Sequence, residues 1–87
     1  MTITKQTVAD KIASYLRHDN SLSELVGWAE DAMMDGEFDE QEAATISDVV
    51  SRLGVADVRA FGLSWEDSEQ LLRQLGYIAR VDIVTAQ

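Results

Sequence analysis

The segment Asp31–Glu42 holds the residues whose types and spacing come closest to a metal-binding site. Calcium-binding loops of the EF-hand kind supply oxygen ligands from positions 1, 3, 5, 7 and 9 of 12 residues, with glycine at position 6 and a bidentate glutamate at position 12. Counted from Asp31, position 6 is Gly36. The predicted ligands are the carboxylates of Asp31, Asp35, Asp39 and Glu42 and the backbone carbonyl of Glu37.

The same segment has a second interpretation that needs no metal ion. Position 3 of the loop is Met33, and a thioether is a poor ligand for a hard cation. In this interpretation Gly36 ends one helix in the left-handed conformation, Asp39 caps the start of the next helix, and Glu42 completes a capping box. We expect the capped turn and keep a single calcium-binding module as the alternative; no other cofactor is expected.

Negative charge is concentrated in the middle of the chain. The 87 residues carry 16 acidic and seven basic side chains, a formal net charge of −9. Between Arg17 and Arg52 there is no lysine or arginine, whereas the remaining residues carry six acids against seven bases. The ten acids of this interval are Asp19, Glu24, Glu30, Asp31, Asp35, Glu37, Asp39, Glu40, Glu42 and Asp48.

This charge distribution predicts the kind of partner. Nucleic acids and anionic membranes are bound largely by lysine and arginine, so both should be repelled. A basic protein surface should be attracted, and an inhibitor or immunity-like antagonist of a nucleic-acid-binding protein would fit. We expect the partner-binding residues to be Trp28, Glu30, Glu37 and Glu40, with Trp28 at the margin of the core.

The composition argues against an enzyme. The chain has no cysteine and one histidine, His18, which the sequence places at the end of a helix. No serine lies in a Gly-x-Ser-x-Gly motif or beside the histidine, so a nucleophile–base pair is missing. A membrane-spanning segment is not expected, because no apolar run is long enough, and a secretory signal is not expected, because no basic start followed by an apolar core lies near Met1. We therefore expect a cytoplasmic protein.

Helical periodicity and capping signals predict four helices in a single domain, residues 1–87. The first covers about Lys5–Arg17 after Thr4, and the second follows Ser21 to about Met34, with Met33 in its apolar stripe. The third runs from Asp39 to Leu53, and the last follows Ser64 and stops at Gly76. Three capping boxes are expected, namely Ser21 with Glu24, Asp39 with Glu42, and Ser64 with Asp67. The expected fold is a small all-α bundle.

The end of the chain has a different character. Residues Tyr77–Val84 are rich in β-branched and aromatic side chains, which predicts a short C-terminal β-strand. A lone strand cannot satisfy its own backbone hydrogen bonds. We therefore expect it to pair with the N-terminal residues Met1–Thr4 or with a second subunit, which would make a homodimer. The alternative is an extended segment that packs over the helical bundle without pairing.

A stretch of the middle region resembles a known family. Trp28-Ala29 is followed by Asp35-Gly36-Glu37 and by Asp39-Glu40-Gln41-Glu42, and the stretch ends at Leu53-Gly54. This order of helix, Asp-Gly, acidic turn and helix, over residues 28–54, resembles the tellurite-resistance TerB-like helical domains. The resemblance implies an all-helical domain whose acidic turn can hold a cation. As a small acidic helical chain, the protein is also similar in kind to bacterial nuclease-immunity proteins.

Overall fold

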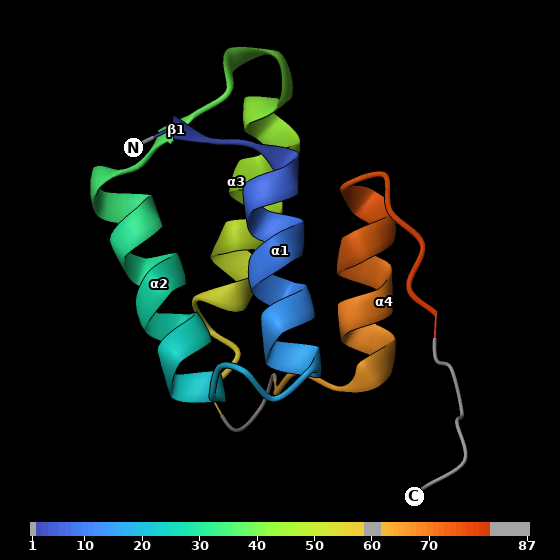
Figure 1. The fold of residues 1–87 in the computed structure, drawn as a ribbon. Coiled ribbons are helices and arrows are strands. Elements are labelled where there is room, and N and C mark those ends of the chain that lie inside the picture. Colours follow the sequence, from blue (N-terminus) through green and yellow to red (C-terminus); the bar gives the residue numbers. More distant parts are fainter. Residues whose placement is uncertain (1, 59–61, 81–87) are drawn as a thin grey trace, which may run out of the picture.

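The computed structural model describes residues 2–58 and 62–80, and this part of the chain forms a bundle of four α-helices (Figure 1). The helices are α1 (Lys5–Leu16), α2 (Leu22–Asp35), α3 (Ala43–Leu53) and α4 (Trp65–Gln74). The expected all-α bundle of four helices is confirmed, with helix ends within a few residues of their predicted positions.

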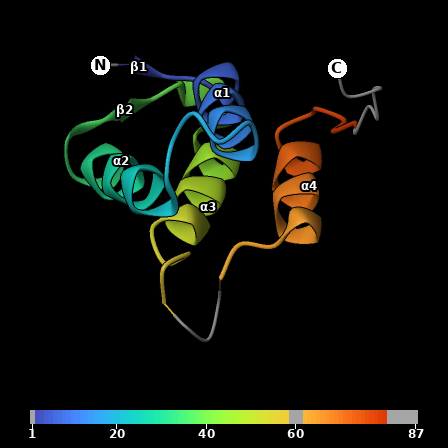
Figure 2. The same cartoon turned by 60° about the horizontal axis from the view of Figure 1, so that its bottom comes forward.

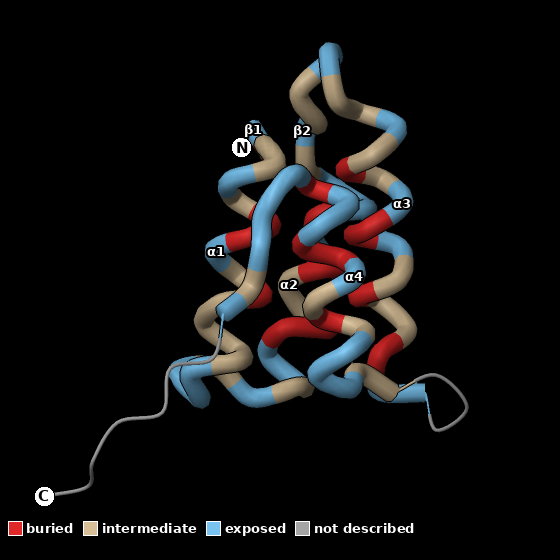
Figure 3. The backbone as a smooth tube through the Cα atoms, turned by 90° about the vertical axis from the view of Figure 1, so that its right-hand side faces the viewer, coloured by how far each residue is buried: buried red, intermediate tan, exposed pale blue. Residues whose placement is uncertain are grey.

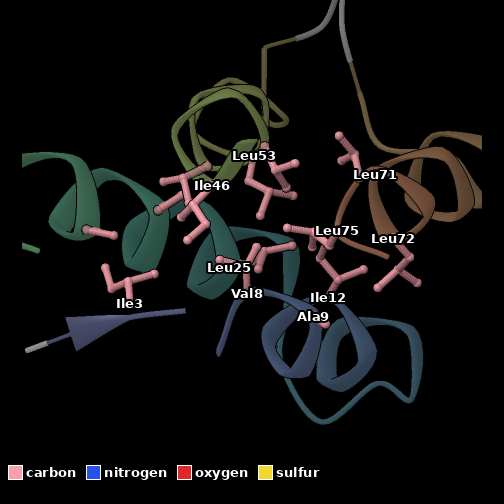
Figure 4. Packing of buried hydrophobic residues seen from close by; sticks show 14 residues of the cluster. Ile3, Val8, Ala9, Ile12, Leu25, Ile46, Leu53, Leu71, Leu72 and Leu75 are labelled. Atoms are coloured by element: carbon pink, nitrogen blue, oxygen red, sulfur yellow. The ribbon is translucent and has the colours of Figure 1, made fainter. Parts of the chain in front are cut away.

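Helices α1 and α3 lie between α2 and α4, and each of them contacts all three other helices. The most extensive contact between helices is that of α2 with α3, while α2 and α4 lie on opposite sides of the molecule (Figures 1 and 2). Buried positions lie on the sides of the helices that face one another, and the outer sides are exposed (Figure 3). The core (Figure 4) consists of Ile3, Val8, Ala9, Ile12, Leu25, Ala29, Ala32, Ile46, Val49, Val50, Leu53, Leu71, Leu72 and Leu75.

A two-residue strand at the N-terminus has a partner that the sequence did not indicate. Strand β1 (Thr2–Ile3) pairs in parallel with β2 (Glu37–Phe38), and the backbone N–H of Asp39 donates to the carbonyl oxygen of Ile3 at 3.0 Å. Parallel strands need a long crossover, which α1 and α2 supply here. Among the described residues, the N-terminal strand therefore pairs with β2, and not with residues 77–80 of the predicted C-terminal strand.

The predicted C-terminal strand is not seen in the residues that the structure describes. Residues 77–80 form no strand, and residues 81–84 of the prediction lie outside the described residues, as does pairing with a second subunit through them. Gly76, with φ of 94°, ends α4 in a Schellman motif, in which the N–H of Tyr77 donates to the carbonyl of Leu72 at 2.8 Å. The chain then turns back beside α4, so that Ala79 packs against the core and Ile78 is exposed.

Side-chain caps fix where the helices begin. The predicted capping boxes of α2 and α4 are both present, with Ser21 and Ser64 accepting from the backbone N–H of Glu24 and Asp67 at 3.1 Å. The third differs from the prediction. Asp39 accepts from the N–H of Gln41 at 3.2 Å and caps a short 3-10 helix, η1 (Glu40–Glu42), that leads into α3.

Gly36 ends α2 for a different reason from the predicted one. Its φ of −77° and ψ of 149° are extended and accessible to any residue, so the expected left-handed conformation is wrong. Steric contact explains the glycine instead. A Cβ atom at this position would collide with Cδ1 of Ile3 and lie 2.6 Å from the carbonyl oxygen of Ala32. Glycine here allows β1 to approach the end of α2.

Among the described residues other than glycine, His18 is the one with a left-handed conformation, and its φ is 65°. His18 follows the last turn of α1 in a Schellman motif, in which the N–H of Asp19 donates to the carbonyl of Ser14 at 2.8 Å. A side chain with a Cβ atom is strained in this conformation, and glycine is not.

We expect His18→Gly to raise the free energy of unfolding by about 0.5–1 kcal/mol, because relief of this strain outweighs the added flexibility of the unfolded chain. Urea unfolding measures the change. Asn20→Gly is the matched control, since Asn20 has no positive φ, and it should lower stability. Equal losses in both variants would contradict the interpretation.

Candidate functional site

The structure separates the five predicted calcium ligands into different roles. Helix α2 continues through Asp35, so Asp31 and Asp35 are exposed residues of a regular helix and not of a loop. Asp39 accepts the capping hydrogen bond of η1, and Glu42 forms an ion pair with Lys5 at 3.4 Å. Among residues 2–58 and 62–80, no three acidic, histidine or cysteine side chains come together as a metal-binding group. Calcium binding at this segment stays a prediction.

Trp28, one of the four predicted partner-binding residues, has a structural role. Its side chain is half-buried and packs against the core cluster. The Nζ atom of Lys11 in α1 lies 5.6 Å from the centre of the ring, a cation–π contact between α1 and α2. The indole therefore helps to hold these two helices together and offers only part of its surface to a partner.

The other three predicted residues, Glu30, Glu37 and Glu40, are exposed. They belong to a group of carboxylates at the end of α2, in β2 and in η1, which we call the acidic surface. The acidic surface consists of Glu30, Asp31, Asp35, Glu37 and Glu40. None of the five has an ion pair or a side-chain hydrogen bond to any described residue.

Sequence reasoning missed two exposed methionines beside these carboxylates. It placed Met33 in the apolar stripe of the second helix, but 48% of Met33 and 80% of Met34 are exposed. The hydroxyl of Ser51 in α3 donates to Sδ of Met33 at 3.6 Å, so Met33 lies over the outer edge of the α2–α3 contact. The residue four positions earlier, Ala29, fills the core side of this turn. The available signal in the sequence was the pair of alanines, Ala29 and Ala32, in the same apolar stripe, because small side chains are typical of a helix side that packs closely against its neighbours.

Arg52 joins α3 to the start of α4. Its Nη2 atom donates to the carbonyl of Gly62 at 2.9 Å and lies 3.5 Å from Oδ2 of Asp67. The same carboxylate accepts from the backbone N–H of Ser64 at 3.0 Å. The hydrogen bonds from Ser64, with a smaller contribution from the positive charge of Arg52, hold the pKa of Asp67 below its ordinary value.

This lowered pKa predicts a contribution to stability that depends on pH. The contribution of Asp67 is present above the pKa of the unfolded chain, about 4, and is lost as the pH falls through the lower pKa of the folded state. In thermal unfolding from about pH 6 to about pH 3, Asp67→Asn should be less stable than wild type at the upper end, and the difference should shrink toward the lower end. Glu66→Gln, a neighbour in the same turn of α4, is the control. A difference that is constant with pH would contradict this role.

In the part of the chain that the structure describes, no helix is both long and apolar enough to cross a membrane. The chain matches no protein-family model, no curated protein and no solved structure. The TerB-like resemblance of residues 28–54 therefore stays a prediction.

Proposed function

We propose that this chain is a non-enzymatic interaction module that binds a basic protein partner through the acidic surface. The observation that carries the proposal is the exposure of these five carboxylates, none of which is paired with a described cation. They lie within 11 consecutive positions, Glu30–Glu40, of an interval without lysine or arginine.

Electrostatics explains why such a surface suits a basic partner. Carboxylates of like charge repel one another, and a partner's lysine and arginine side chains relieve that repulsion on binding. Opposite fields also accelerate association and make it sensitive to salt. A phosphate backbone or an anionic lipid surface would add to the repulsion. An antagonist of a nucleic-acid-binding protein, of the inhibitor or immunity kind, has the required charge.

The test uses charge reversal at the acidic surface. The immobilised chain is incubated with lysate from its own cells, and the proteins retained at about 50 mM salt are compared with those retained at about 300 mM. We expect a basic protein to be retained at low salt and largely lost at high salt. Glu37→Lys with Glu40→Lys should lose it even at low salt, because both substitutions reverse the charge where the partner docks.

The matched control changes the net charge equally but elsewhere. Asp10→Lys with Glu69→Lys alters α1 and α4 and should retain the partner better than the variant at the acidic surface. If the two double variants lost the partner equally, the partner would not bind at the acidic surface. Millimolar calcium is added in a parallel arm. A calcium-dependent rise in melting temperature that Glu42→Gln abolishes would favour the calcium-binding alternative.

A further inference from the structure

The outer face of α2 combines apolar surface with negative charge. Gly27, Glu30, Asp31 and Met34 are spaced at i, i+3, i+4 and i+7, so they lie along one side of the helix. This side points away from the bundle, since Glu30, Asp31 and Met34 are all exposed and α2 lies at the edge opposite α4 (Figures 1 and 2). Met34, at 80% exposure, is the largest apolar group on it.

Gly27 is unexplained by the packing of the chain itself. Glycine in the interior of a helix is destabilising relative to alanine. A Cβ atom added at Gly27 would meet no atom within 4 Å, so no described neighbour requires the glycine. The absence of a side chain leaves the backbone of α2 open to close approach from outside, one helical turn before the Glu30–Asp31 pair.

We propose that the outer face of α2 binds a basic amphipathic helix of a partner protein. The apolar side chains of that helix cover Met34 and approach α2 closely at Gly27, and its lysine or arginine side chains lie against Glu30, Asp31 and Asp35. The inference rests on the proposed function and assigns one kind of ligand to the α2 part of the acidic surface.

Charge complementarity selects this occupant over a second copy of the chain. Two copies of α2 placed face to face would bring Glu30 and Asp31 against the same residues, which like-charge repulsion opposes. A helix with basic and apolar sides matches both properties of the face. Methionine suits the contact because its unbranched, polarisable side chain adapts to irregular apolar partners.

The test uses a synthetic peptide as the probe. It is an amphipathic helix of about 18 leucine and lysine residues, with leucines at i, i+3, i+4 and i+7. A second peptide has the same composition but a scrambled order that spreads the leucines around the helix. Fluorescence anisotropy at about 50 mM salt measures the affinity of the folded chain for each. We expect tighter binding of the amphipathic peptide.

Substitutions without a change of charge then separate this inference from the general acidic surface. Met34→Gln and Gly27→Gln should each weaken binding about fivefold or more, because one removes the apolar contact and the other blocks close approach. Ile78→Gln is the matched control, since Ile78 is 79% exposed but follows α4, and it should leave affinity unchanged. Gly27→Gln should keep or raise the melting temperature, which separates lost binding from lost folding.

Three results would overturn the inference. These are no binding of the amphipathic peptide, equal affinity for the scrambled peptide, and affinity that Met34→Gln and Gly27→Gln do not reduce more than Ile78→Gln does. None of these results overturns the proposed function, provided that retention of the lysate protein still depends on salt and on Glu37 and Glu40. Loss of that dependence would overturn the proposed function itself.

Discussion

Replacing Ile3 with alanine is expected to lower the free energy of unfolding by about 2–5 kcal/mol, a large effect for a residue so close to the chain terminus. Ile3 is fully buried and belongs to the core cluster, although its strand has only two residues. Its side chain lies against Gly36, where α2 ends, and its carbonyl accepts from Asp39. Truncation would leave a cavity beneath the turn that carries part of the acidic surface.

A double-mutant cycle tests the contact between Ile3 and Gly36 by urea unfolding. Gly36→Ala alone should cost about 1–3 kcal/mol, because its Cβ collides with Ile3. In the Ile3→Ala background the same change should cost less, since the collision with Cδ1 is gone and only the close approach to the carbonyl of Ala32 remains. Thr2→Ala, an exposed change in the same strand, is the control. Additive losses would show that the two residues do not interact.

Leu53→Ala is expected to cost a similar amount, about 2–5 kcal/mol, for a different reason. Leu53 is fully buried in the last turn of α3, which, like α1, contacts each of the other three helices. Its side chain points into the middle of the core, toward α1 and α4 (Figure 4). A cavity there removes contacts at the centre of the bundle, where the surrounding helices cannot all move inward to fill it.

The matched control for Leu53→Ala is Val58→Ala, which removes apolar atoms from a side chain that is 45% exposed. This change should alter stability by no more than about 0.5 kcal/mol. Thermal unfolding followed by circular dichroism measures both variants. A loss from Val58→Ala as large as that from Leu53→Ala would mean that burial does not control stability as the structure implies.

The acidic surface was predictable from sequence only in part. Charge is a property of composition, so the position of Glu30, Glu37 and Glu40 along the chain already indicated a negative region. Whether those carboxylates are paired depends on where Lys5 and Arg17 lie in the folded chain. Lys5 forms an ion pair with Glu42 and Arg17 with Asp19, so the five carboxylates of the acidic surface have no described cation as a partner.

The sequence by itself determined the helices, because their signals are local. Periodic apolar residues and the capping boxes at Ser21 and Ser64 act within a few positions of one another, and those boxes form as predicted. Tertiary structure alone decided the features that join distant residues. Pairing of β1 with β2 depends on the path of α1 and α2, and the need for Gly36 depends on Ile3, 33 positions earlier. Met33 is exposed although its spacing fits the apolar stripe, because alanines already fill the core side of α2. Periodicity describes one helix, whereas burial is set by the space that the neighbouring helices leave.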